Sequence, residues 1–252
     1  MHGKYYTVTV PVEEKGNGET AFADADVLFN WTSFEIPKGA ACLKSIHIAM
    51  KGTNGADANK LDMELYFAKS IDGVAPSAFG ALNGAATAAL AAACRRNIIG
   101  HKFIDASERS DDEDLIGYNV WGAGVTTAAS TAVSDLILEG DPSYGGTEGY
   151  QTIWVAGIAK GAFDFGTAVA LNQGSGQAVT TVNTQLTTDG TDPRNVFMKG
   201  DVVQAQDNAA IGTVVSVDSA TTMTVDGVAA ILADDDTINW KYPLEFVLGF
   251  EY

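Results

Sequence analysis

The most constraining feature of this chain is the alternation of apolar and polar residues along its first seventy positions. Between residues 4 and 12, Tyr6, Val8 and Val10 share one side and the intervening residues share the other. A period of two belongs to β-strands, whose successive side chains point to opposite faces. One-sided alternation is typical of antiparallel sheets with one solvated face. Similar strands are predicted at residues 27–36, 43–51 and 61–67.

The middle of the chain predicts further strands around one segment of less certain structure. Residues 153–158 are apolar on both faces, which predicts a strand in the centre of a sheet. Residues 81–96 are rich in alanine and leave two alternatives open, a short helix or a loosely ordered surface arm. The other strands of this region are predicted at 97–105, 115–121, 134–139 and 150–159.

A change in composition near Leu171 predicts an insertion. Few large apolar residues follow until about residue 191, and then short apolar segments alternate with tight turns, as in a small barrel-like β module. Residues 244–251 return to strong alternation and resemble the N-terminal strands. We therefore predict a mainly β protein, an antiparallel β-sandwich (1–170 plus 241–252) with a small inserted β-barrel-like module (171–240). Chain termini that lie close together within one domain make such an insertion easy to accommodate.

The charge balance excludes two classes of partner. The chain has 32 acidic and 15 basic residues, a formal net charge of −17. Nucleic-acid binding needs clustered Lys and Arg, and an anionic membrane attracts basic segments, so neither partner is expected. No apolar run has the length of a signal peptide or a membrane span, and we expect a soluble protein made in the cytoplasm.

No motif points to catalysis. The sequence has no phosphate-binding Gly-x-x-x-x-Gly-Lys-Ser/Thr loop, no His-Glu-x-x-His and no Gly-x-Ser-x-Gly, so neither an enzyme nor a cofactor is predicted. The acidic runs Asp111–Asp114 and Asp234–Asp236 lack the spacing of a cation-binding loop, which favours solvated loops and leaves cation binding open. Whether Cys42 and Cys94 pair is also open.

Part of the module is similar to known virion proteins. The segments Lys199–Val203, Gly212–Val225 and Ala233–Ile238 resemble small β modules in structural proteins of tailed bacteriophages. Leu61–Lys69 and Leu244–Phe250 resemble virion proteins of phages that infect marine or cyanobacterial hosts. The resemblance implies a virion structural protein, made in the host cytoplasm and located on the capsid surface. It favours a head decoration or cement protein that binds the major capsid protein, bridges neighbouring capsomers and forms a homo-oligomer, with a trimer favoured.

The candidate partner contacts lie in two segments. Tyr5 and Tyr6 stand at the start of the first strand, and Leu82 and Leu90 lie in the alanine-rich segment. Ordinary packing within the domain is the competing interpretation for all four. Two other functions stay open. One is a tail- or fibre-associated structural protein, and the other is a carbohydrate-binding sandwich that uses Trp31, Trp121, Trp154 or Trp240 as a stacking platform.

Overall fold

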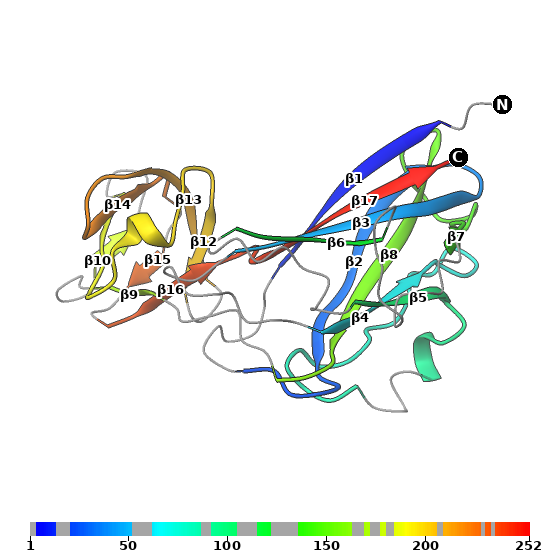
Figure 1. The fold of residues 1–252 in the computed structure, drawn as a ribbon, viewed down its shortest axis with the longest axis horizontal. Helices are drawn as coiled ribbons and strands as arrows, with labels where there is room; N and C mark the ends of the chain where they lie inside the picture. The colour runs from blue at the N-terminus through cyan, green and yellow to red at the C-terminus, as the bar shows by residue number, and fades with distance from the viewer. Residues whose placement is uncertain are drawn as a thin grey trace.

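The fold consists of two packed antiparallel sheets joined to a smaller β structure (Figure 1). A computed structural model describes most of the chain. The described residues are 4–13, 21–51, 62–86, 92–104, 115–121, 136–162, 169–171, 177–179, 184–205, 209–227, 230–232 and 235–252.

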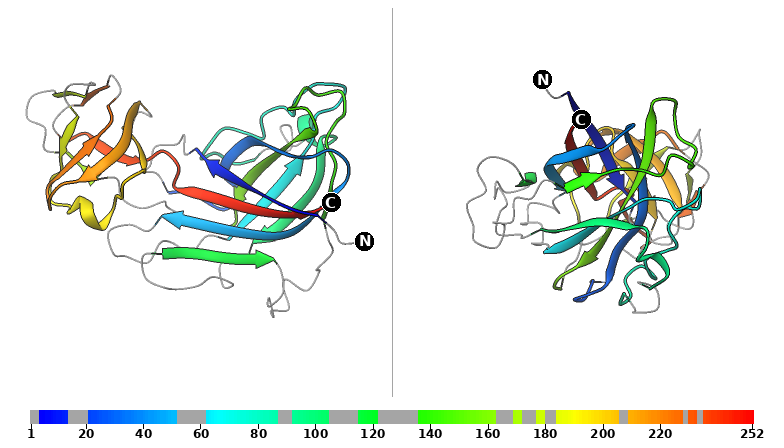
Figure 2. Two further views of the ribbon diagram at one scale, coloured as in Figure 1. Left: turned by 90° about the horizontal axis from the view of Figure 1, so that it is seen from above. Right: turned by 90° about the vertical axis from the view of Figure 1, so that its right-hand side faces the viewer.

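The two larger sheets form the sandwich (Figures 1 and 2). The five-stranded sheet has the order β1 (Tyr5–Val12), β17 (Leu244–Glu251), β3 (Ala41–Lys51) and β6 (Leu115–Trp121), and β7 (Leu136–Leu138) also pairs with β3. The four-stranded sheet has the order β2 (Val27–Pro37), β8 (Tyr150–Ala159), β4 (Met63–Ala68) and β5 (Ile98–Ile104). Every pair of neighbouring strands in both sheets is antiparallel.

The apolar faces of these two sheets enclose one core. Phe246 on β17 lies between Val10 and Ile48 in the register of its sheet, and all three side chains are buried. The Phe246 ring lies 5.5 Å, centroid to centroid, from that of Phe29 on the opposite sheet. Burial of such a side chain stabilises a fold by roughly 1.5–3 kcal/mol. The core therefore depends on residues from both ends of the chain.

The inserted strands form a second structure with its own core. Its six-stranded sheet has the order β11 (Gln185–Thr187), β14 (Thr222–Val225), β13 (Ala210–Val217), β12 (Val202–Ala205), β16 (Thr237–Trp240) and β9 (Val169–Ala170). The sheet curls until its ends meet, because Leu171 forms a β-bridge with Thr188. A two-stranded sheet, β10 (Gln177–Val179) with β15 (Ala230–Leu232), and the 3-10 helix η3 (Pro193–Asn195) complete it. Its apolar cluster includes Val203, Met223, Ile238 and Trp240.

The predicted fold class is confirmed in its main features. The chain is mainly β, β8 lies between β2 and β4, and β17 lies between β1 and β3 as the returning strand. The curled sheet is barrel-like, although it already includes β9, which starts two residues before the predicted boundary at Leu171. Whether the two parts are separable domains stays a prediction.

The alanine-rich segment is not one helix. Leu82 and Ala85 form β-bridges with Val27 and Asp26, so the helical alternative is wrong for residues 81–86. A short helical turn covers 92–94, and residues 87–91 lie outside the described part of the chain.

Candidate functional site

The outer face of the five-stranded sheet carries a cross-strand row of four side chains at the end where the termini lie. The register pairs Tyr5 with Glu251, Glu251 with Cys42, and Cys42 with Ile137, so the four align across β1, β17, β3 and β7. Strand spacing makes this row about 14 Å long. We call these four residues the terminal row.

The termini themselves are fixed at this end. Lys4 and Tyr252 exchange two backbone hydrogen bonds of 3.1 and 3.0 Å. The start of β1 and the end of β17 consequently lie side by side, at the end of the sandwich away from the inserted structure (Figures 1 and 2).

The terminal row has apolar ends and a charged centre. Tyr5 is 75% exposed and Ile137 is 62% exposed, whereas the strand neighbours of each contact the core. Glu251 forms an ion pair with Lys44, with 3.3 Å between the carboxylate oxygen and Nζ. Tyr5 and Ile137 stand at opposite ends of the row, with Glu251 and Cys42 between them. This arrangement suits contact with another protein surface.

Of the four sequence-predicted contacts, the three that the structure describes, Tyr5, Tyr6 and Leu82, do not gather in one place. Tyr6 lies on the opposite face of β1 from Tyr5, packs against the core and lies 6.0 Å from the Tyr150 ring, centroid to centroid. Burial, with the Tyr150 side chain next in importance, raises the pKa of Tyr6. Leu82 is half-buried on the outer side of the other sheet, and Leu90 lies outside the described residues. Only Tyr5 belongs to the terminal row.

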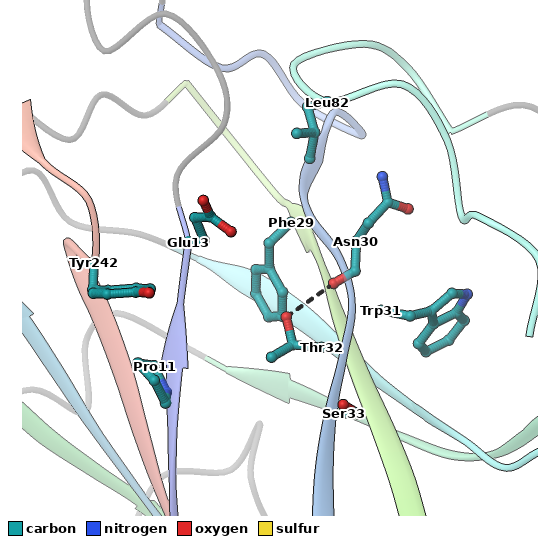
Figure 3. A pocket seen from close by; sticks show the side chains of 9 residues that line it. All are labelled: Pro11, Glu13, Phe29, Asn30, Trp31, Thr32, Ser33, Leu82 and Tyr242. Carbon is teal, nitrogen blue, oxygen red and sulfur yellow. Dashed lines mark hydrogen bonds between the residues drawn. The ribbon is translucent and has the colours of Figure 1, made fainter. Parts of the chain in front are cut away.

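A cavity of about 510 Å³ opens between β1 and β2, the edge strands of the two sheets (Figure 3). The side-chain amide of Asn30, beside this cavity, has a structural role. It accepts a hydrogen bond from the Phe79 N–H and donates one to the Gly80 carbonyl, both at 2.8 Å. Thr32 donates to the Asn30 carbonyl at 3.3 Å. The lining residues are Pro11, Glu13, Phe29, Asn30, Trp31, Thr32, Ser33, Leu82 and Tyr242.

Trp31 is the tryptophan that borders this cavity. Its indole N–H donates to the Ser77 carbonyl at 2.7 Å, and its ring lies edge-on to Phe79 at 5.3 Å between centroids. Trp154 and Trp240 are buried, so neither offers a stacking surface. Trp121 is the last residue of β6, and its side chain lies outside the described part of the chain.

A polar cluster on the outer face of the four-stranded sheet surrounds Glu64. Its two carboxylate oxygens each lie 2.9 Å from a nitrogen, one from His101 Nδ1 and one from Lys160 Nζ. Burial raises the pKa of Glu64, but hydrogen bonds from Lys160 and Tyr66 outweigh it and hold the pKa below its ordinary value. Burial, together with the Glu64 hydrogen bond, raises the pKa of Tyr66 to about 12. A carboxylate so engaged is a poor proton acceptor, and the cluster links β4, β5 and the end of β8.

Asp141 is a second structural carboxylate. It accepts hydrogen bonds from the Gly73 N–H, the Ser143 N–H and hydroxyl, and the Ser70 hydroxyl. These bonds, the Gly73 N–H foremost, hold the pKa of Asp141 well below its usual range. The hydrogen bonds of the Asp141 side chain therefore link the loop after β4 to the loop before β8.

The remaining candidates from the sequence do not assemble into a site within the described residues. Within this part, no three His, Cys, Asp or Glu side chains are placed to hold a metal ion. Asp111–Asp114 and Asp234 lie outside it. Cys42 and Cys94 form no disulfide, since Cys42 lies on the outer face of one sheet and Cys94 is buried beneath the outer side of the other.

The comparisons with known proteins identify no family for this chain. No protein-family model matches the chain, and a search of curated proteins finds no match. Among the described residues, no helix is long and apolar enough to cross a membrane.

Three of the four residues in the terminal row, Glu251, Cys42 and Ile137, were not predicted as contacts from the sequence. Alternation within each strand indicates that Glu251 and Cys42 face outward. It also indicates that Tyr5 and Tyr6 lie on opposite faces of β1. No local signal aligns residues 5, 42, 137 and 251, because their register depends on pairing between distant strands.

Proposed function

We propose that this chain is a non-enzymatic structural protein of a tailed-bacteriophage particle, a decoration protein that binds the outer capsid surface and bridges neighbouring capsomers. The observation that carries the proposal is the terminal row, which exposes Tyr5 and Ile137 on either side of the Glu251–Lys44 ion pair. Tyr is one of the residue types enriched among the side chains that dominate protein–protein contacts.

A row about 14 Å long makes a small contact, and this is compatible with a decoration protein. Many copies bound to one lattice act together, so each individual contact can be weak. The formal charge of −17 makes free copies repel one another in solution, and attachment then depends on a complementary partner surface.

The first test is the number of copies in purified particles of the virus that encodes the chain, measured by quantitative mass spectrometry. Several hundred copies per particle support a capsid lattice component. A few copies, up to some tens, replace this proposal with the tail or fibre alternative. Absence of the chain from the particles refutes a virion role altogether.

The second test addresses the terminal row itself. The double variant Tyr5→Ser, Ile137→Ser should lower particle occupancy about tenfold, because each truncation removes an exposed anchor. Met198→Ser is the matched control, since Met198 is 68% exposed but lies in the inserted structure. Deleting residues 1–6 is a less specific test, because Tyr6 packs against the core and pairs with Phe250. Equal occupancy of the double variant and the control removes the terminal row from the proposal.

Carbohydrate binding is a second candidate, favoured by the position of Trp31 at the cavity between β1 and β2. A glycan array tests it, and the signal must disappear in Trp31→Ala and persist in Trp121→Ala. Absence of any glycan signal rejects this candidate and leaves the virion proposal untouched.

A further inference from the structure

Within the described residues, one edge strand of the sandwich forms ladder hydrogen bonds on a single side. β1 pairs with β17 on one side only and is the terminal strand of its sheet (Figure 1). No described residue pairs with its other side.

The direction of each backbone group on β1 follows from its register. Lys4 and Tyr252 exchange both hydrogen bonds, so every second residue after Lys4 also bonds to the β17 side. The N–H groups of Tyr5, Thr7 and Thr9 therefore point away from β17. Their carbonyl groups point the same way, which leaves this edge with the donors and acceptors of an incomplete ladder.

The β1 strand lacks the charged side chains that commonly protect an edge strand against pairing. Natural edge strands commonly carry a Lys or another charge that prevents strand addition. β1 reads YYTVTVPV and has no charged residue, although the chain has 47 Asp, Glu, Lys and Arg side chains in all (32 + 15). Tyr, Val and Thr also favour strands strongly. Within β1, Pro11 has no N–H and so limits pairing, and it lies near the end of the strand.

We propose that the β1 edge is a homodimer interface, at which β1 pairs antiparallel with β1 of a second copy about a two-fold axis through Thr7. The axis places Thr7 opposite its own counterpart, and Tyr5 opposite the second copy's Thr9. The three resulting pairs exchange about six hydrogen bonds and join two sheets into one. Pro11 lies outside these pairs.

A second copy is the occupant that this edge fits best. A two-fold interface must be self-complementary, and an edge of alternating donors and acceptors is self-complementary in the antiparallel direction. Two copies that each carry −17 meet with the least repulsion along a neutral strand. The pairing produces a dimer in place of the trimer that the family resemblance implies. It uses the backbone edge and leaves the outer face of the terminal row accessible, so it does not depend on the proposed virion function.

Sedimentation velocity of the full chain tests the interface, with protein from micromolar to several hundred micromolar and salt near about 0.15 M to screen the net charge. The wild type should form a concentration-dependent dimer. Thr7→Lys places two ammonium groups opposite each other on the axis, and Thr7→Pro removes the N–H at the axis while keeping the bonds to β17. Each variant should weaken dimerisation at least tenfold.

Ser45→Lys is the matched control, because Ser45 is exposed on β3 of the same sheet and adds the same charge away from the edge. It should dimerise like the wild type. A wild type that stays monomeric throughout the range overturns the proposal, and so does a dimer that persists in both Thr7 variants. Equal loss of dimer in Ser45→Lys shows an effect of charge alone and also overturns it.

Discussion

Truncating Phe246 to alanine tests how the sandwich is held together. Phe246 is fully buried, lies between Val10 and Ile48 within its sheet, and packs 5.5 Å from the Phe29 ring on the other sheet. Removing a buried phenyl group costs about 3–5 kcal/mol, which combines lost transfer free energy with the cavity left behind. Domains are stabilised by about 5–15 kcal/mol in total, so Phe246→Ala removes a large part of this margin. For a unit of this size we expect the Tm to fall by about 6–20 °C.

Differential scanning calorimetry and urea unfolding measure this loss, with Met223→Ala as the matched control. Met223 is equally buried but belongs to the apolar cluster of the inserted structure. If that structure is a domain of its own, each variant shifts a different transition. A loss below about 1 kcal/mol in Phe246→Ala would refute the packing argument. One shared transition, lowered by both variants, would contradict the predicted division into domains.

Three further predictions concern single residues. Asp141→Asn should lower the free energy of unfolding at neutral pH. This loss should shrink as the pH falls below about 4, because the lowered pKa of Asp141 stabilises the fold only while its carboxylate is ionised. Urea unfolding at several pH values measures the loss, and a loss that stays constant with pH contradicts the prediction. Gly157→Ala should lower the free energy of unfolding by about 1–3 kcal/mol, since the new methyl group would clash with a carbon of the buried Phe29 ring. An unchanged urea midpoint is the opposing result. Glu64→Gln should lower the pKa of Tyr66 from about 12, while burial keeps this pKa above 10. Ultraviolet titration of the tyrosines measures the change. An unchanged pKa shows that Glu64 does not contribute to the raised pKa of Tyr66.

The strands of this protein could be predicted well because their signal is local. A strand with one face in the core must alternate along the chain, and β1, β3 and β4 do so in the sequence itself. The return of β17 to the first sheet could also be predicted, because its large apolar residues contrast with the small ones before it. The helical alternative for residues 81–86 failed because helix propensity is weak, and pairing with Val27 and Asp26 overrides it.

The candidate site could be predicted only in part, because it depends on strand order and register. Alternation determines that Tyr5 faces away from the core, but only long-range pairing with β17, β3 and β7 aligns it with Glu251, Cys42 and Ile137. Likewise, the sequence alone determined a neutral, strand-forming start, and the tertiary structure decided that this strand lies at an edge. The physical reason is the same in both cases. A strand's own residues determine which side chains face the core, whereas backbone hydrogen bonds between segments far apart in the sequence determine its neighbours.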